Sequence, residues 1–192
     1  MAGRPRTVTD DQILAATARA ISRVGPHGLT LAAVAAEAGL AAPTLVQRFG
    51  SKRGLLLAFS RQASSDPAAR FAAARDRHPS PLKALRAALI GMAGGIDTPE
   101  ELANHLAFLQ LELVDPDFRE HVLAYANAML AQIHGLLADA AHRGELGRRD
   151  LHALARAVYC TYNGALITWA VLREGTLTQW LGRELDVMLT SS

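Results

Sequence analysis

The 192-residue sequence has one cysteine, few aromatic residues and no long apolar run. Because Cys160 is the only cysteine, no disulfide can form within the chain, and we expect a reducing compartment. No apolar run reaches the ~18 residues that span a bilayer. The basic start, Met-Ala-Gly-Arg-Pro-Arg, leads into no apolar segment of the kind a signal peptide contains. The sequence therefore predicts a cytoplasmic protein with no membrane partner, in which Cys160 is a small core residue.

Signatures of catalysis and metal binding are also missing. None of the seven histidines lies three or four residues from another, so the helical two-histidine spacing of many metal sites is absent. We find no phosphate-binding loop, no Rossmann-type glycine fingerprint and no nucleophile elbow. We therefore expect that the protein is not an enzyme and has no cofactor or metal.

Charge is distributed unevenly along the chain. Up to Arg61 there are eight basic and three acidic side chains, although the formal net charge of the whole chain is only +2. A basic N-terminal part on an acidic remainder favours a polyanionic partner for the first part alone. The alternative is a basic face that is only exposed to solvent, which charge alone does not exclude.

Abundant alanine and clear helix start and stop signals indicate an all-α protein. Capping boxes begin at Thr9, Thr98 and Thr176. Glycines at 25, 39, 50 and 144 follow predicted helices, and we find no strand signal. The pattern predicts about nine helices, with the end of the fourth left uncertain by Pro67. Their approximate ranges are 9–25, 31–38, 42–49, 52 onward, 81 onward, 98–114, 115–144, 150–173 and 176–189.

Two short helices around Ala38-Gly39-Leu40-Ala41 have the spacing of a helix-turn-helix, whose second helix enters the DNA major groove. Leu45 and Phe49 would face inward together, which turns the other side of this helix toward DNA. Small residues there permit close approach, and Gln47 and Arg48 can bond base edges or phosphates. Residues at helix N-termini favour phosphate. The predicted DNA contacts are Thr30, Ala42, Pro43, Thr44, Gln47, Arg48, Ser51 and Lys52.

The segment GLTLAAVAAEAGLAAPTLVQRFGSKRGLL closely resembles the DNA-binding part of the TetR family of bacterial transcriptional regulators. The resemblance is specific over residues 9–57 and is architectural beyond them. It implies a homodimer on a palindromic operator of double-stranded DNA, released by a small-molecule effector. It also implies phosphate contacts at Thr30 and Lys52, and a DNA-contact surface at Pro43, Thr44, Gln47 and Arg48.

Two positions depart from the family pattern. Val46 stands where a tyrosine is usual, and Ala41 where a polar cap is usual, which removes one expected phosphate contact. Arg4 and Arg6 form a possible minor-groove arm, with a terminus that carries incidental arginines as the alternative.

The C-terminal part offers two further sets of candidates. A small-residue stripe on the helix from Asp150, together with leucines of the last helix, predicts a four-helix dimer interface, with an intramolecular core as the alternative. The dimer candidates are Ala157, Gly164, Thr168, Val171, Leu181 and Leu185. A mainly apolar pocket with a few polar groups, Gln110 and Glu112 being possible ones, would hold the effector. The ligand candidates are Met92, His105, Phe108, Leu109, Tyr125, Met129, Tyr162 and Asn163.

Together these features predict a helix-turn-helix domain over residues 1–50 and a helical ligand-binding and dimerisation domain over residues 51–192. The predicted function is a ligand-responsive, DNA-binding transcriptional regulator, with a repressor favoured. The alternative is a dimeric helical ligand-binding or interaction module whose DNA-binding part no longer functions.

Overall fold

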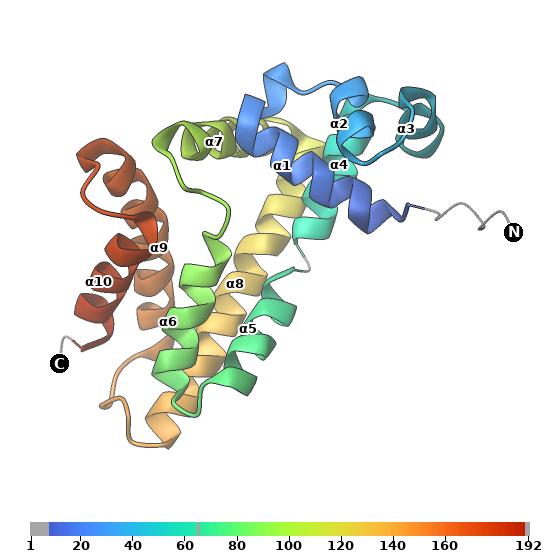
Figure 1. The fold of residues 1–192 in the computed structure, drawn as a ribbon. Coiled ribbons are helices and arrows are strands. Elements are labelled where there is room, and N and C mark those ends of the chain that lie inside the picture. The colour runs from blue at the N-terminus through green and yellow to red at the C-terminus, as the bar shows by residue number, and fades with distance from the viewer. Residues whose placement is uncertain (1–7, 65, 191–192) are drawn as a thin grey trace, which may run out of the picture.

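The computed structural model describes residues 8–64 and 66–190 and is drawn in Figure 1. Within these residues the chain forms ten helices and no strand, so the expected all-α class is confirmed. The helices are α1 (Asp10–Gly28), α2 (Leu31–Glu37), α3 (Ala42–Phe49), α4 (Lys52–Ala63), α5 (Asp66–Arg77), α6 (Pro81–Met92), α7 (Pro99–Val114), α8 (Pro116–His142), α9 (Leu151–Leu172) and α10 (Leu177–Thr190).

Helix α5 is additional to those that the sequence pattern marks. It starts at Asp66, next to Pro67, and proline is well tolerated in the first turn of a helix because its missing amide would lack a partner there anyway. Proline therefore opens a new helix here. Arg4 and Arg6, the possible minor-groove arm, lie outside the described residues.

The predicted helix starts are confirmed in their hydrogen bonds. Thr9 and Gln12 form a reciprocal capping box, as do Thr98 and Glu101. At the start of α10 the amide of Gln179 donates to Thr176 Oγ1, and the amide of Thr176 donates to the Gln179 side chain. These bonds satisfy amides that the first helical turn would otherwise leave without a partner.

The regular part of α1 stops where the sequence predicts, at Gly25, which has φ +67°. A side chain there would be strained, and its Cβ would lie 2.8 Å from the side-chain oxygen of Asn104 on α7. Asn104 also donates from Nδ2 to the carbonyl of Ser22 at 2.8 Å. The glycine thus lets the end of α1 dock closely on α7. The end of α9 differs from expectation, because Arg173, with φ +56°, makes the left-handed cap ahead of Gly175.

Two hydrophobic clusters hold the chain together. One joins α1, α2, α3 and α4 and is completed by Phe108 of α7 and Phe118 of α8. The other lies among α5 to α10 and forms the body of the molecule. Figure 1 shows α1–α4 at one end, crossed by α7, with α5, α6 and α8 running side by side away from them and α9 and α10 alongside. We call α1–α3 the head and α5–α10 the body; α4 connects them.

Three sequence expectations for the last two helices need correction. Leu181 and Leu185, expected at a dimer interface, are fully buried in the body cluster of the same chain. They face inward because α10 packs on α9 and α6 with this side. Cys160, expected in the core, is exposed on α9.

Candidate DNA-binding surface and internal cavity

Helix α3 presents one face to the head and one to solvent. Leu45 is fully buried in the head cluster and Phe49 packs against that cluster, which fixes the rotation of α3 about its axis. Pro43 and Gln47 are consequently exposed on the opposite side, and Ala42 and Thr44 are half-buried beside them. Val46, in the place of the usual tyrosine, is 49% exposed on the same outer side. The geometry therefore leaves a short helix with small residues and one amide side chain facing outward.

The two helix starts beside α3 carry hydroxyl caps. Thr30 Oγ1 accepts from the amide of Ala33 at the start of α2, and Ser51 Oγ accepts from the amide of Gly54 at the start of α4, each at 3.1 Å. Both residues are exposed. Gly54 itself is required by close packing, because a Cβ there would overlap the carbonyl of Phe49. Ala41 supplies no side-chain cap to α3.

The two expected basic contacts are held by the head itself. Arg48 donates from Nη1 to the carbonyl of Val8 at 2.7 Å and pairs with Asp10 at 3.2 Å. Lys52 donates from Nζ to the carbonyl of His27 at 2.9 Å. That carbonyl belongs to the single turn that follows the kink at Gly25. Both side chains thus brace α1, and a role on DNA would use the remaining donors or a rearranged side chain.

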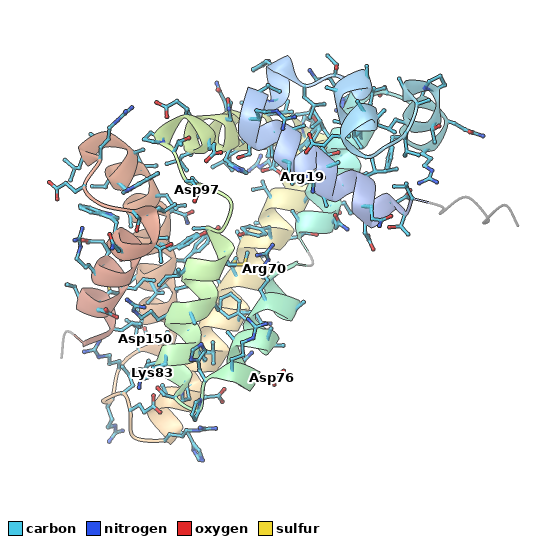
Figure 2. The ribbon with its side chains drawn as sticks, in the orientation of Figure 1. Arg19, Arg70, Asp76, Lys83, Asp97 and Asp150 are labelled. Carbon is cyan, nitrogen blue, oxygen red and sulfur yellow. The ribbon has the colours of Figure 1, made fainter. Side chains whose placement is uncertain are left out.

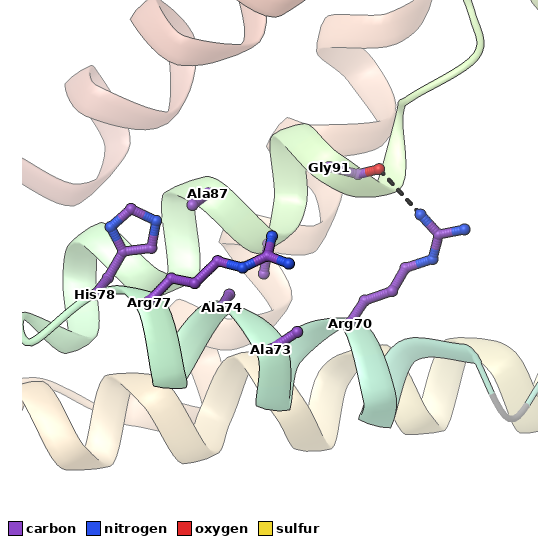
Figure 3. Close-up of a pocket in the computed structure, with 8 residues that line it drawn as sticks. Arg70, Ala73, Ala74, Arg77, His78, Ala87 and Gly91 are labelled. Atoms are coloured by element: carbon purple, nitrogen blue, oxygen red, sulfur yellow. Dashed lines mark hydrogen bonds between the residues drawn. The ribbon is translucent and has the colours of Figure 1, made fainter.

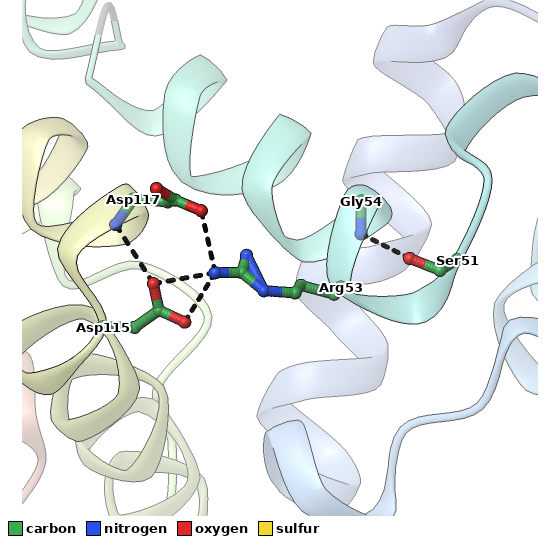
Figure 4. Close-up of polar contacts among 5 residues, drawn as sticks. All are labelled: Ser51, Arg53, Gly54, Asp115 and Asp117. Atoms are coloured by element: carbon green, nitrogen blue, oxygen red, sulfur yellow. Dashed lines mark hydrogen bonds and ion pairs between the residues drawn. The ribbon is translucent and has the colours of Figure 1, made fainter.

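Much of the basic excess near the N-terminus is compensated in space. Glu37 of α2 lies between Arg19 and Arg23 of α1, 2.7 Å from each, and these ion pairs lower the pKa of Glu37 (Figure 2, which labels Arg19). Arg53, at the start of α4, pairs with Asp115 and Asp117 at the corner between α7 and α8 (Figure 4). The charge count along the sequence therefore overestimates the positive potential of the head.

A cavity of about 310 Å³ lies under the head, between α1, α4, α5, α6, α7 and α8. Four of the predicted ligand residues, Met92, His105, Phe108 and Tyr125, line it together. Glu112, weighed from the sequence as a possible polar contact, lines it as well. The sequence analysis missed side chains that α4, α5 and the start of α8 contribute, because α5 was not predicted as a helix and sequence periodicity does not show which helices meet around a cavity. The added residues are Phe59, Ser60, Gln62, Arg70, His121 and Val122.

The other predicted ligand residues lie elsewhere. Met129 and Tyr162 are buried in the body cluster, where α8 packs on α9. Asn163 is exposed on α9 and donates to the carbonyl of Tyr159. Leu109 is half-buried but does not line the cavity. Helical spacing places aromatic and sulfur side chains on a common face, but the same spacing also produces ordinary core residues. Met129 and Tyr162 are such core residues.

The polar side of the cavity contains a buried hydroxyl and a half-buried carboxyl. Ser60 is 2% exposed, and its hydroxyl donates a hydrogen bond to Oε1 of Glu112 at 2.5 Å. This bond links α4 to α7. Burial raises the pKa of Glu112, and the Ser60 hydrogen bond opposes that rise. Burial also lowers the pKa of His105, which favours its neutral form at neutral pH.

A separate groove of about 290 Å³ runs between α5 and α6 (Figure 3). Its lining consists of alanines and Gly91 together with Arg70, Arg77 and His78. Arg70 donates to the carbonyl of Gly91 at 3.2 Å and borders both this groove and the cavity under the head. Within the described residues, no group of three metal-ligating side chains comes together, and no helix is long and apolar enough to cross a membrane.

The outer face of α9 carries exposed apolar side chains. Val171 is 74% exposed and Ile167 49%, and Gly164 and Thr168 are exposed beside them; Ala157 is half-buried. On α10, Val187 is exposed as well. The predicted dimer residues on α9 therefore lie on or at the edge of a surface available to a partner.

Known proteins share both the sequence signature of the head and the fold. The family model for bacterial regulatory proteins of the tetR family matches residues 13–59, which span most of α1 through most of α4. No curated protein sequence matches the chain.

Solved structures share the fold over nearly the whole chain. A Rhodococcus sp. protein assigned to the TetR family is 24% identical, covers 94% of this chain and 98% of its own, and has a TM-score of 0.69. The TetR family regulator PfmR of Thermus thermophilus is 21% identical, with coverage of 92% and 96% and a TM-score of 0.66. The regulator FadR of Bacillus subtilis, solved with stearoyl-CoA, is 18% identical, with coverage of 96% and 100% and a TM-score of 0.71. The signature of the tetR family of bacterial regulatory proteins thus covers residues 13–59, and the chain as a whole shares its fold with solved TetR-family regulators.

Proposed function

We propose that the protein is a ligand-responsive repressor that binds a palindromic operator as a homodimer and leaves it when a small, mainly apolar molecule binds. The observation that carries this proposal is the position of the cavity. It is lined by Ala18 of α1 and by Phe59 and Ser60 of α4, so an occupant touches the helices that hold α3.

On DNA, α3 would enter the major groove with its exposed face. Gln47 is the best placed side chain for base edges, because it is exposed and its amide can bond adenine bidentately. Pro43 and Ala42 would approach the groove floor closely, with Thr44 beside them. Thr30, Ser51 and Lys52, at the starts of α2 and α4, would contact phosphates, and Arg48 would do so from the far end of α3.

Dimerisation would use the exposed apolar face of α9. Gly164, Thr168 and Val171, with Ala157 at the edge, remain the proposed contacts, and Ile167 joins them. Val187 would extend the surface onto α10, in place of the buried Leu181 and Leu185. Small residues let two helices approach closely, which suits a two-fold contact between copies.

The effector would bind under the head. Of the residues that the sequence suggests for this role, Met92, His105, Phe108 and Tyr125 remain the proposed contacts. FadR of Bacillus subtilis was solved with stearoyl-CoA, so a protein of the same fold takes up a ligand with a large apolar part. A ligand shifts the equilibrium only if it binds the two states unequally, so effector and operator would oppose each other reciprocally.

Mechanistically, the effector would change the separation of the two heads in the dimer. Half-sites for such dimers lie one helical turn, about 34–36 Å, or a multiple apart, so a tilt of α4 would move α3 out of register. The proposed division keeps residues 1–50 as the DNA-binding domain and residues 51–192 as the ligand-binding and dimerisation domain. Residues Leu55, Phe108 and Phe118 complete the head cluster from beyond residue 50, which would carry the coupling.

Salt dependence of binding to random-sequence duplex DNA tests the DNA-binding role directly. We expect the logarithm of affinity to fall linearly with the logarithm of salt concentration, and Lys52→Ala to flatten that slope by about 0.9 for each phosphate that the variant no longer neutralises. Lys83→Ala, at an exposed lysine of α6 in the body, is the matched control and should leave the slope unchanged. Absence of any duplex binding at low salt by the folded protein would instead favour the ligand-binding or interaction module with an inactive head, which Val46 and Ala41 suggest.

A further inference from the structure

Glu112 is an acid that lines a cavity without a basic partner among the described residues. Its Oε1 is bonded by Ser60 Oγ at 2.5 Å, and no ion pair reaches it from any residue within 8–64 and 66–190. Taking a carboxylate out of water is costly unless a counter-charge or several hydrogen bonds compensate it. One hydroxyl is a small compensation. Among the described residues, this half-buried carboxyl therefore has a hydrogen bond from Ser60 but no ion pair.

Aromatic rings line the same cavity as this acid. Phe59 of α4 and Phe108 of α7 meet edge to face with 5.3 Å between ring centroids, and both line the cavity together with Tyr125 of α8. Aromatic faces attract cations through their quadrupole, and the attraction grows where water is excluded. A carboxylate without a counter-charge among aromatic rings is therefore complementary to a positively charged group.

We propose that the effector carries a cationic nitrogen on an apolar body, with the nitrogen paired to Glu112 and the body against Phe59, Phe108 and Tyr125. The proposal rests on the effector role of the cavity and adds the chemical class of the ligand. At Glu112 a cation is complementary to the carboxylate and an anion is not. Arg70 lines the same cavity and would attract an anion, but it donates to the carbonyl of Gly91.

Binding at Glu112 also reaches the head directly. The Ser60–Glu112 bond connects α4, which follows α3 by two residues, to α7 of the body. A cationic nitrogen competes with Ser60 for the same carboxylate, so its entry weakens the α4–α7 link. Glu112 thus binds the ligand's charge and also holds α4, the helix that follows α3.

Calorimetric titration of the full chain with three small probes tests the ligand class. The probes are benzyltrimethylammonium, which is always cationic, 2-phenylethanol, which is neutral, and phenylacetate, which is anionic. We expect the cation to bind at least about ten-fold more tightly than either of the others. Glu112→Gln should abolish this preference, whereas Glu120→Gln, at an exposed acid of α8, should preserve it.

The pH profile separates Glu112 from its neighbours. The other titratable or charged groups that face the cavity are Arg70 of α5, His105 of α7, and His121 and Tyr125 of α8. Because benzyltrimethylammonium keeps its charge, its affinity should rise with pH above about 4.5 as Glu112 ionises. The Glu112→Gln variant retains the histidines, so any rise that survives in it belongs to them.

Equal affinities for the three probes, tighter phenylacetate binding, or no saturable binding of the cation to folded protein would overturn the inference. Duplex DNA binding is measured in the same samples. DNA binding without cation preference overturns the ligand class alone, whereas cation binding at Glu112 without DNA binding counts against the regulator function.

Discussion

Arg53 joins α4, the helix that follows α3, to the body through Asp115 at the corner between α7 and α8. Its Nη2 lies 2.8 Å from Oδ2 of Asp115 and 2.9 Å from Oδ2 of Asp117 (Figure 4). Its guanidinium also lies 5.3 Å from the centre of the Phe118 ring. A residue that lies in a basic stretch of the sequence thus holds α4 to the body.

Replacing Arg53 by glutamine should therefore affect stability more than DNA binding. We expect the free energy of unfolding to fall by about 1 kcal/mol, because the variant lacks two partly exposed ion pairs and one cation–π interaction. The salt slope of DNA binding should stay unchanged, since the two aspartates already neutralise this arginine. Urea denaturation and salt titration measure the two effects. Arg148→Gln, at an exposed residue between α8 and α9, is the control, and a flatter salt slope for Arg53→Gln would show that Arg53 contacts phosphate.

Gln47 and Lys52 should differ in what they contribute on DNA. Gln47→Ala should lower affinity for the preferred sequence by about 1–3 kcal/mol and relax the preference at one base pair per half-site, because alanine cannot bond a base edge. Lys52→Ala should weaken binding to all sequences alike. Competition assays against operators changed at single positions distinguish the two patterns. A uniform loss of affinity for Gln47→Ala would assign the side chain to the DNA backbone.

Val171 is exposed on α9 and Leu181 is fully buried on α10, so the two should respond differently to substitution. Val171→Asp places a charge on a side chain that is 74% exposed, so it should leave the monomer folded and abolish the dimer. Leu181→Ala removes a fully buried side chain and should cost about 2–5 kcal/mol of stability. Light scattering after gel filtration, with thermal unfolding, measures both. A Val171→Asp protein that remains dimeric would move the interface off this face of α9.

Glu112 should make stability depend on pH. Burial raises its folded-state pKa, so the unfolded chain ionises first as pH rises above about 4.5, and stability is lost from there through the folded-state pKa. The Glu112→Gln variant cannot ionise at this position, so it should melt at a higher temperature than the wild type at neutral pH. The difference between the two should be smaller near pH 4.5. Melting curves across the range measure it. A lower melting temperature for the variant at every pH would mean that the Ser60 bond outweighs the burial of the charge.

The head was largely predictable from sequence because short-range signals specify it. Thr9, Thr30 and Ser51 cap the helices that they were expected to cap, and Gly25, Gly39 and Gly50 end helices with positive φ. These effects act within one turn, so neighbouring residues are enough to infer them. The orientation of α3 also followed, because Leu45 and Phe49 fix one face.

The body was less predictable because it depends on which helices meet. Periodicity assigns Leu181, Met129 and Tyr162 to an apolar face without saying what covers that face, and in the fold the chain itself covers it. The Ser60–Glu112 contact joins residues 52 positions apart, and the Arg53–Asp115 contact joins residues 62 apart. Such pairs leave no local pattern in the sequence. Because ion pairs such as Arg53–Asp115 form between distant residues, counting charges along the chain overestimated the positive charge available to DNA.

Selection of duplexes from a random pool by the purified full chain tests the central claim most directly. We predict enrichment of an inverted repeat whose half-sites lie one helical turn or a multiple apart, with the preferred bases relaxed in the Gln47→Ala variant. Enrichment of no sequence by a folded, dimeric protein would contradict the regulator function. Enrichment that is identical for wild type and for Gln47→Ala would contradict base recognition by this face of α3.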